Sequence, residues 1–231
     1  MKREQIASTG AEFMARKKGK GGGKRKRSQQ RAQYDELDKY PVIPPHAFAR
    51  IVRDKQTLNI LYQIIEPPMT KKEQEQREEI MDIFIRSLTA NIEEIDADPD
   101  AYLRTALDKV IKSYGMKINK KSKSKMFYYL RRDLIGYGKM DMMMHDINVE
   151  DISLDGTNVP IFAYHRKFES VETTCVWETD AELESYVIKL AQRCGKHISV
   201  AEPLLDATLM DGSRIVMKLG REISTRGSAF C

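Results

Sequence analysis

No stretch of this 231-residue sequence is apolar for long, because charged side chains make up 32% of it and interrupt the 41% that are hydrophobic. A helix that spans a membrane needs about 20 consecutive apolar residues. The first residues, MKREQIASTGAEFM, also lack the apolar region of a secretory signal. We therefore expect a cytoplasmic protein.

Cysteine is scarce, and the three cysteines form no C-x-x-C pair: Cys175, Cys194 and Cys231. This pattern argues against a disulfide framework and against a zinc site. The four histidines show no metal-ligand spacing either: His46, His145, His165 and His197. We expect reduced structural thiols and no metal centre.

Local catalytic motifs are also missing, including G-x-S-x-G, H-E-x-x-H and the phosphate-binding loop G-x-x-x-x-G-K-[ST]. Two stretches come near the last of these. GKGGGK (residues 19–24) is followed by Arg25 where Ser or Thr is required, and Gly195-Lys196 is followed by His197. No local motif supports catalysis on its own.

Positive charge is concentrated at the N-terminus. Residues 1–33 carry 11 Lys/Arg and 2 Asp/Glu, whereas the rest of the chain carries 28 Lys/Arg and 32 Asp/Glu. Because Arg16–Arg31 is rich in glycine and has no apolar periodicity, we expect residues 1–39 to be a disordered tail. Its basic cluster comprises Lys17, Lys18, Lys20, Lys24, Arg25, Lys26 and Arg27.

Two interpretations of this tail stay open. It attaches the protein electrostatically to anionic lipid or nucleic acid, or it is a solubilising segment. Nucleic acid is the less favoured partner, because no aromatic residue lies between Arg16 and Arg31 to stack on bases.

Residues 40–136 are expected to form a proline-containing lead-in, a strand and a three-helix unit. The prolines of Tyr40–Asp54 favour an extended lead-in, and Leu58–Pro68 is typical of a strand. A capping box at Thr70 and Glu73 begins the first helix, and Asp98-Pro99 begins the second. A basic link, Lys117–Lys125, then leads to a third helix that ends at Gly136. The apolar positions at helical spacing are Ile80, Phe84, Leu88, Tyr102, Leu103, Ala106, Leu107, Val110, Ile111, Tyr114, Met126, Phe127, Leu130 and Leu134.

From residue 137 to residue 231 the apolar period changes from 3.6 to 2, which predicts a mixed antiparallel α+β domain. Three strands are expected over residues 149–177. A helix capped by Thr179 follows, and then a hairpin whose turn is Asp211-Gly212. In that hairpin Ile215, Met217 and Leu219 alternate inward.

Four stretches of this region together resemble the N-terminal half of the archaeal type II/IV secretion ATPases, a family that includes the archaellum motor and the assembly ATPases of archaeal type IV pili. They are DINVEDISLDG (146–156), YHRKF (164–168), LAQRCGKHISVAEPLLDATLMDGSR (190–214) and GREISTRGSAF (220–230). The resemblance is strong over residues 136–230, weaker over 58–136 and absent in the tail. Because the phosphate-binding loop of that family would follow Cys231, we expect this chain to be the N-terminal part of a longer ATPase and to hydrolyse no ATP alone.

The resemblance implies a PAS-like domain on a homohexameric ring, hinged to a catalytic domain that binds ATP and Mg²⁺. Arg214, Arg221 and Arg226 match the hinge-side basic residues that sense nucleotide in this family. The alternative for Arg214 is a plain position on the solvated face of a strand. The implied partners are the catalytic domain, neighbouring subunits, a polytopic membrane platform protein and an anionic membrane surface, which places the protein at the inner face of the cell membrane.

A second hypothesis stays open, in which the chain is a stand-alone adaptor that binds nucleic acid or an acidic partner through its tail. The two hypotheses are separated by whether a G-x-x-x-x-G-K-[ST] stretch follows residue 231 in the gene.

Overall fold

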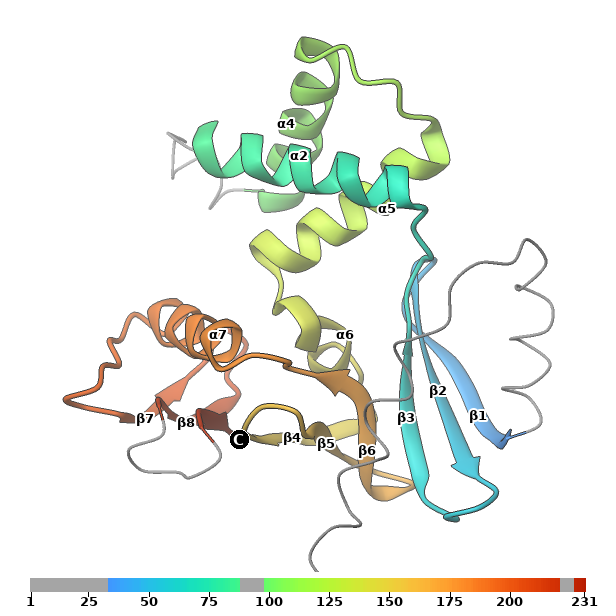
Figure 1. Cartoon of the computed structure of the whole chain (residues 1–231), viewed down its shortest axis with the longest axis vertical. Coiled ribbons are helices and arrows are strands. Elements are labelled where there is room, and N and C mark those ends of the chain that lie inside the picture. The colour runs from blue at the N-terminus through green and yellow to red at the C-terminus, as the bar shows by residue number, and fades with distance from the viewer. Residues whose placement is uncertain (1–32, 88–97, 221–226) are drawn as a thin grey trace, which may run out of the picture.

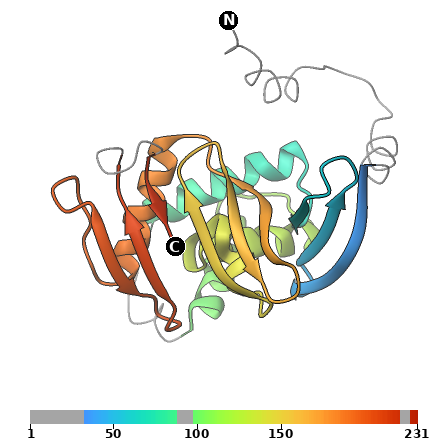
Figure 2. The ribbon, with the colours of Figure 1, turned by 90° about the horizontal axis from the view of Figure 1, so that it is seen from below.

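The computed structural model describes residues 33–87, 98–220 and 227–231, and it has an α+β fold (Figure 1). Among these residues there are five α-helices and one nine-stranded mixed sheet. The strands form one continuous layer, and the helices lie on one face of it (Figure 2). None of the helices among the described residues has the length and apolar character that a membrane crossing requires.

The sheet has the strand order β1-β2-β3-β6-β5-β4-β9-β8-β7. Neighbouring strands are antiparallel except β3 and β6, which are parallel and pair only at Leu61–Glu172 and Tyr62–Thr173. The strands are β1 (Tyr34–Ile43), β2 (Ala47–Asp54), β3 (Ile60–Ile65), β4 (Val149–Asp155), β5 (Pro160–His165), β6 (Glu169–Val176), β7 (Leu204–Thr208), β8 (Arg214–Lys218) and β9 (Ala229–Phe230).

The helices begin where side chains cap them. Asp98 accepts from the Ala101 amide at the start of α4, and Thr179 accepts from the Glu182 amide at the start of α7. The helices are α2 (Lys71–Ser87), α4 (Pro99–Ser113), α5 (Lys120–Leu130), α6 (Asp141–Met144) and α7 (Asp180–Arg193). A π-helical turn (Arg131–Ile135) and a 3₁₀ turn (Gly138–Met140) connect α5 to α6.

Two apolar cores hold these elements together. The core of α2, α4 and α5 contains Ile80, Phe84, Leu103, Leu107, Met126, Phe127 and Leu130, as the helical spacing predicts. Tyr114, the last position of the predicted stripe in the second helix, is 59% exposed and lies outside this core. Leu88, the remaining position of that pattern in the first helix, lies outside the described residues. The larger core lies between the sheet and α6 and α7, where Trp177 is 1% exposed and packs against Tyr186 and Phe230.

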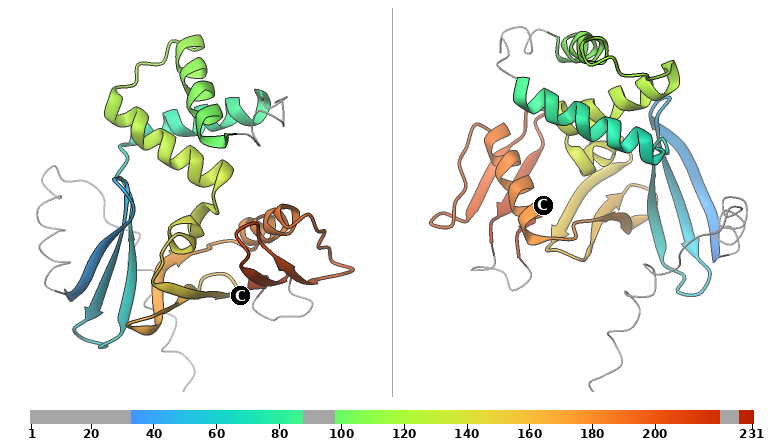
Figure 3. Two further views of the ribbon diagram at one scale, coloured as in Figure 1. Left: turned by 180° about the vertical axis from the view of Figure 1, so that it is seen from behind. Right: turned by 45° about the horizontal axis from the view of Figure 1, so that its top comes forward.

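Basic side chains join the helical unit to the sheet. The Arg132 guanidinium lies 2.8 Å from both carboxylate oxygens of Glu66, just after β3. Arg193 of α7 donates to the carbonyl oxygens of Leu134, Ile135 and Gly136, which the helical backbone leaves free at the end of the π-helical turn. As a result, α5, the π-helical turn and α6 form a column from the helical unit down to the sheet (Figure 3).

A buried polar cluster joins β1 and β3 to the segment before β4. The Asp146 carboxylate accepts from the hydroxyls of Tyr40 (2.7 Å) and Tyr62 (2.6 Å). Tyr40 also lies 3.0 Å from Nε2 of His165, which is 2% exposed. Burial and the acceptor at Asp146 raise the pKa of both tyrosines, and burial lowers the pKa of His165. The cluster is therefore held with neutral tyrosines that both donate to Asp146.

Two segments differ from the sequence-based expectations. Tyr40–Asp54 is not a lead-in but belongs to the β1–β2 hairpin, and β1 begins at Tyr34, inside the range that we expected to be the tail. Prolines are tolerated there because β1 is an edge strand of the sheet. The basic link is partly helical, because Asn119 caps α5 and the helix starts at Lys120.

Candidate functional site

Arg214 stands on a hairpin at the edge of the sheet. β7 and β8 pair from Leu204–Lys218 to Thr208–Arg214, and β7 is the last strand of the sheet. The turn follows the predicted Asp211-Gly212, where Gly212 has φ +89° and the Ser213 amide donates to Asp211. Ile215, Met217 and Leu219 are buried as predicted, so Arg214 points to the opposite, solvent side.

The Arg214 side chain is 76% exposed, and Asp206 of β7 holds it. The guanidinium donates through Nε (3.1 Å) and through a second nitrogen to the two carboxylate oxygens. This pairing raises the pKa of Arg214 and lowers the pKa of Asp206. Lys196 adds a second cation, because its Nζ donates to the carbonyl oxygen of Asp206 at 2.9 Å. The edge of the sheet therefore displays an ordered guanidinium and an ammonium group next to a single carboxylate.

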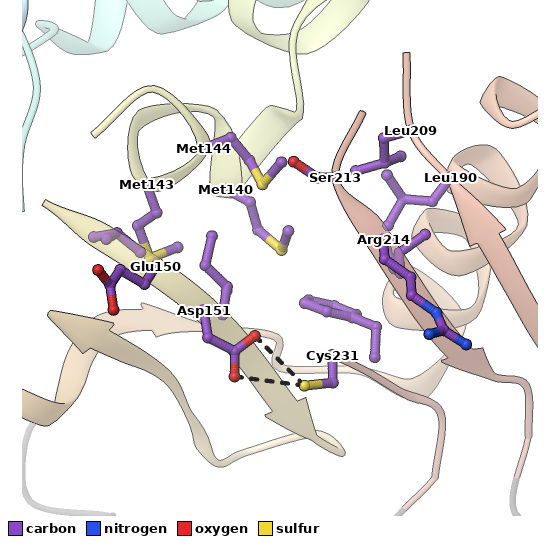
Figure 4. Close-up of a pocket in the computed structure, with 14 residues that line it drawn as sticks. Met140, Met143, Met144, Glu150, Asp151, Leu190, Leu209, Ser213, Arg214 and Cys231 are labelled. Atoms are coloured by element: carbon purple, nitrogen blue, oxygen red, sulfur yellow. Dashed lines mark hydrogen bonds between the residues drawn. The ribbon is translucent and has the colours of Figure 1, made fainter. Parts of the chain in front are cut away.

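A small pocket of about 120 Å³ lies beside this hairpin (Figure 4). Its apolar lining includes Met140, Met143 and Leu190, and its polar lining includes Asp151 and Arg214. Figure 4 shows the Arg214 guanidinium directed away from the methionines. The pocket is too small to hold a nucleotide. A ligand of the Arg214 guanidinium would therefore bind outside the pocket, on the solvent side of the hairpin.

Cys231 closes one side of this pocket and pairs with β8 through its backbone. Its amide and carbonyl group bond to those of Val216 at 2.9 and 2.8 Å. Its Sγ lies 3.7 Å from both carboxylate oxygens of Asp151. Burial, with the negative charge of Asp151, raises the pKa of the Cys231 thiol. The sulfur is therefore a protonated donor and not a reactive thiolate.

The structure places only one of the three predicted hinge arginines. Arg221 and Arg226 lie outside the described residues, as do all seven residues of the predicted basic cluster in the tail. The glycines that flank the two arginines are described, and the Gly220 amide donates to Ser228 Oγ at 2.8 Å. Arg214 begins β8, the strand spans roughly 13 Å from Arg214 to Lys218 at about 3.3 Å per residue, and Gly220 lies two residues beyond its end. Arg214 therefore does not lie next to the attachment point of Arg221.

Sequence reasoning missed Asp206 and Lys196 as neighbours of Arg214. The hairpin register contains the signal for Asp206. Thr208 lies opposite Arg214, so Asp206 is the diagonal neighbour on the same face of the sheet. No such local signal exists for Lys196, which lies in the connection that follows α7. In the part of the chain that the structure describes, no group of three or more His, Cys, Asp and Glu is arranged to hold a metal ion.

Comparison with known sequences adds three relatives, and no protein-family profile matches the chain. The chain is 40% identical to the uncharacterized protein MJ1288 of Methanocaldococcus jannaschii over 164 residues, which are 71% of this chain and 65% of that protein. It is 30% identical over 196 residues to the uncharacterized protein MJ0900 of the same organism, covering 83% of this chain and 34% of that protein. A third, MJ0781, is 34% identical over 90 residues, 38% of this chain and 12% of that protein. The chain thus spans less than two thirds of each relative.

Proposed function

We propose that this chain is the N-terminal regulatory and docking part of a hexameric secretion-type ATPase. That enzyme would couple ATP binding and hydrolysis to the assembly or rotation of an archaeal type IV pilus-like filament, or to protein secretion. The proposal is supported by the four stretches that resemble this family and by relatives from an archaeon. Two of these relatives have most of their length outside the matched region. Residues 137–231, with β4 to β9, α6 and α7, would be the PAS-like domain. ATP with Mg²⁺ would be held and hydrolysed on the catalytic domain.

The observation that carries the proposal is the exposed, ordered guanidinium of Arg214. Arginine suits phosphate because its planar fork donates two parallel hydrogen bonds. Asp206 already holds the fork in a bidentate arrangement, so a phosphate group would replace one bidentate anion by another. Exchange of Asp206 for a terminal phosphate would draw the hairpin toward the nucleotide and so close the two domains. Arg221 and Arg226 are proposed for the same role.

The remaining parts of the chain would serve docking. The core of α2, α4 and α5 is separate from the core of the sheet, so this helical unit is proposed to contact the polytopic membrane platform protein. The basic tail is proposed to lie near the anionic inner face of the cell membrane.

The experiment adds the purified chain to a separately expressed catalytic half and follows the rate of ATP hydrolysis. We expect stimulation that Arg214→Ala, Arg221→Ala or Arg226→Ala returns to the unstimulated rate. Arg166→Ala is the matched control, because Arg166 is an exposed arginine (62%) in the turn between β5 and β6 that pairs with Glu150 of β4. This control should retain full stimulation.

Two outcomes would contradict the proposal at different points. Hydrolysis by the 231-residue chain alone would show that it carries its own catalytic groups. Normal association of the two halves without any change in rate would remove the nucleotide-sensing role and leave a docking platform.

A further inference from the structure

A second, much larger pocket lies on the helical side of the molecule, away from Arg214. It has a volume of about 780 Å³ and lies between the α4–α5 pair and the turn that connects β1 to β2. This volume is within the range of pockets that hold small organic ligands. None of its lining residues belongs to the Arg214 site, and we call it the α4–α5 pocket.

One wall of the α4–α5 pocket is apolar. The end of β1 and the following turn contribute Val42, Ile43, Pro44 and Pro45, which are partly or fully exposed. His46 continues this wall, and its ring packs against the ring of Tyr128 with a centroid distance of 5.4 Å. A wall of aliphatic and proline carbons suits the less polar body of a ligand.

The helical part of the lining is cationic. It contains four basic residues of α4, α5 and the π-helical turn: Arg104, Lys120, Lys123 and Arg131. Only two carboxylates, Asp100 and Asp108, line the same pocket. This part of the lining therefore has two more positive charges than negative ones.

The ion pairs show which cations are already satisfied. Arg131 donates to Asp100 at 2.8 Å, and Lys123 pairs with Asp108. Among the described residues, neither Arg104 nor Lys120 forms a salt bridge. The guanidinium centre of Arg104 lies 4.0 Å from the Phe127 ring centroid, which holds it in place while its N–H groups stay available.

His145 offers a further nitrogen to the pocket. Its Nδ1 lies 2.7 Å from the backbone carbonyl oxygen of Asp141 and is therefore the donor of that bond. The imidazole is 41% exposed and lines the pocket, so Nε2 remains for a ligand.

From these features we propose that the α4–α5 pocket binds a small organic phosphate. Arg104 and Lys120 would hold the phosphate group, because their two charges match a phosphate dianion. The body of the ligand, a ring or a short apolar chain, would lie against the proline turn. This site is separate from the proposed nucleotide contact of Arg214 and does not depend on it.

The test uses phenyl phosphate, which has one ring and one dianionic phosphate, with inorganic phosphate as a second probe. Binding to the full 231-residue chain is followed by broadening of the ³¹P and ring-proton NMR signals of the probe. We expect saturable binding of phenyl phosphate, tighter than that of inorganic phosphate. The double variant R104Q/K120Q should weaken it at least tenfold, and Lys120→Gln alone should weaken it severalfold.

The matched control is K109Q/K121Q, which removes the same charge from exposed positions of the same two helices that do not line the pocket. This control and Arg214→Gln should each change the affinity less than twofold. Absence of saturable binding to the unmodified chain would overturn the proposal. Equal losses in the two double variants would overturn it as well, because they would indicate unspecific attraction to a basic surface. The single Lys120→Gln variant keeps the test valid if loss of the Arg104–Phe127 contact unfolds the chain.

Discussion

At the residue scale, the joint between the helical unit and the sheet depends on a glycine. A Cβ atom at Gly136 would lie 2.1 Å from Oδ1 of Asp141 and 3.0 Å from the carbonyl oxygen of Arg132. Asp141 is 1% exposed and cannot move aside freely, because its Oδ1 accepts from the Tyr137 amide at 2.8 Å. Any side chain at position 136 would therefore collide with the Asp141 carboxylate, which its hydrogen bond to Tyr137 holds in place. The backbone conformation of Gly136 is not the cause.

We predict that Gly136→Ala lowers the free energy of unfolding by about 1–3 kcal/mol, the usual cost of overpacking a buried site. Gly115→Ala is the control, because nothing lies within 4 Å of a Cβ there and only its φ of +62° is unfavourable. Urea denaturation measures the free energy of unfolding of both variants.

The steric cause can be checked with a double-mutant cycle. If Asp141 is the obstacle, Gly136→Ala should cost less in an Asp141→Ala background. Additive costs would show that the strain lies elsewhere.

Among the elements, the start of α2 links its own cap to a neighbouring helix. The Glu73 carboxylate accepts from the Thr70 amide (2.7 Å), as the capping box predicts. It also accepts from Ser122 Oγ (2.7 Å) and Lys125 Nζ (3.1 Å) of α5. The Thr70 and Ser122 hydrogen bonds lower the pKa of Glu73 to about 2.

This lowered pKa predicts a specific pH dependence of stability. A carboxylate whose pKa is lower in the folded state than its ordinary value of 4.5 stabilises the fold above pH 4.5 and loses that contribution as the pH falls toward 2. Because water screens part of it, we expect about 1 kcal/mol. Glu73→Gln should remove this part of the slope between pH 4.5 and pH 2 in urea titrations, while Glu79→Gln, on the exposed side of α2, should leave the slope unchanged.

The elements that the sequence predicted correctly are those with local signals. The caps at Thr70, Asp98 and Thr179 and the turn at Asp211-Gly212 each satisfy hydrogen bonds within a few residues, so their sequence suffices. The helix start at Lys120 was missed because five lysines between 117 and 125 hide the Asn119 cap. The prolines of Tyr40–Asp54 predict an extended lead-in, and no local signal predicts that this segment pairs as a hairpin.

Local patterns encode the Arg214–Asp206 pair of the site but not the α4–α5 pocket. The exposure of Arg214 follows from the alternation with Ile215, and its partner Asp206 follows from the hairpin register. The α4–α5 pocket does not follow from the sequence, because it forms only where the β1–β2 turn meets α4 and α5. Residues such as His46 and Arg104 are brought together there by the fold of the whole chain.

At the scale of the whole molecule, the described fold starts at Gln33. Its side chain donates to Asp54 (3.3 Å), and its carbonyl oxygen accepts from Lys55 (3.1 Å). A deletion that stops at residue 32 keeps both contacts and all of β1.

We predict that deletion of residues 1–32 leaves the thermal unfolding temperature unchanged. The same deletion should abolish binding to vesicles that contain anionic lipid, because it removes the basic cluster. Binding by the full chain should fall as salt rises from 50 to 500 mM, since screening shortens the reach of the charges. Cosedimentation with vesicles measures the fraction of bound protein, and vesicles of neutral lipid are the control. Equal binding before and after the deletion would exclude a membrane role for the tail.

The parallel pairing of β3 with β6 also constrains the order in which the chain can fold during its synthesis. β3 is made early, but β6 begins at Glu169, about a hundred residues later. At roughly 5–20 residues per second, β3 is synthesised some 5–20 seconds before β6. Throughout that interval the edge of β3 lacks its partner strand, and an unpaired strand edge is a template for pairing with other chains.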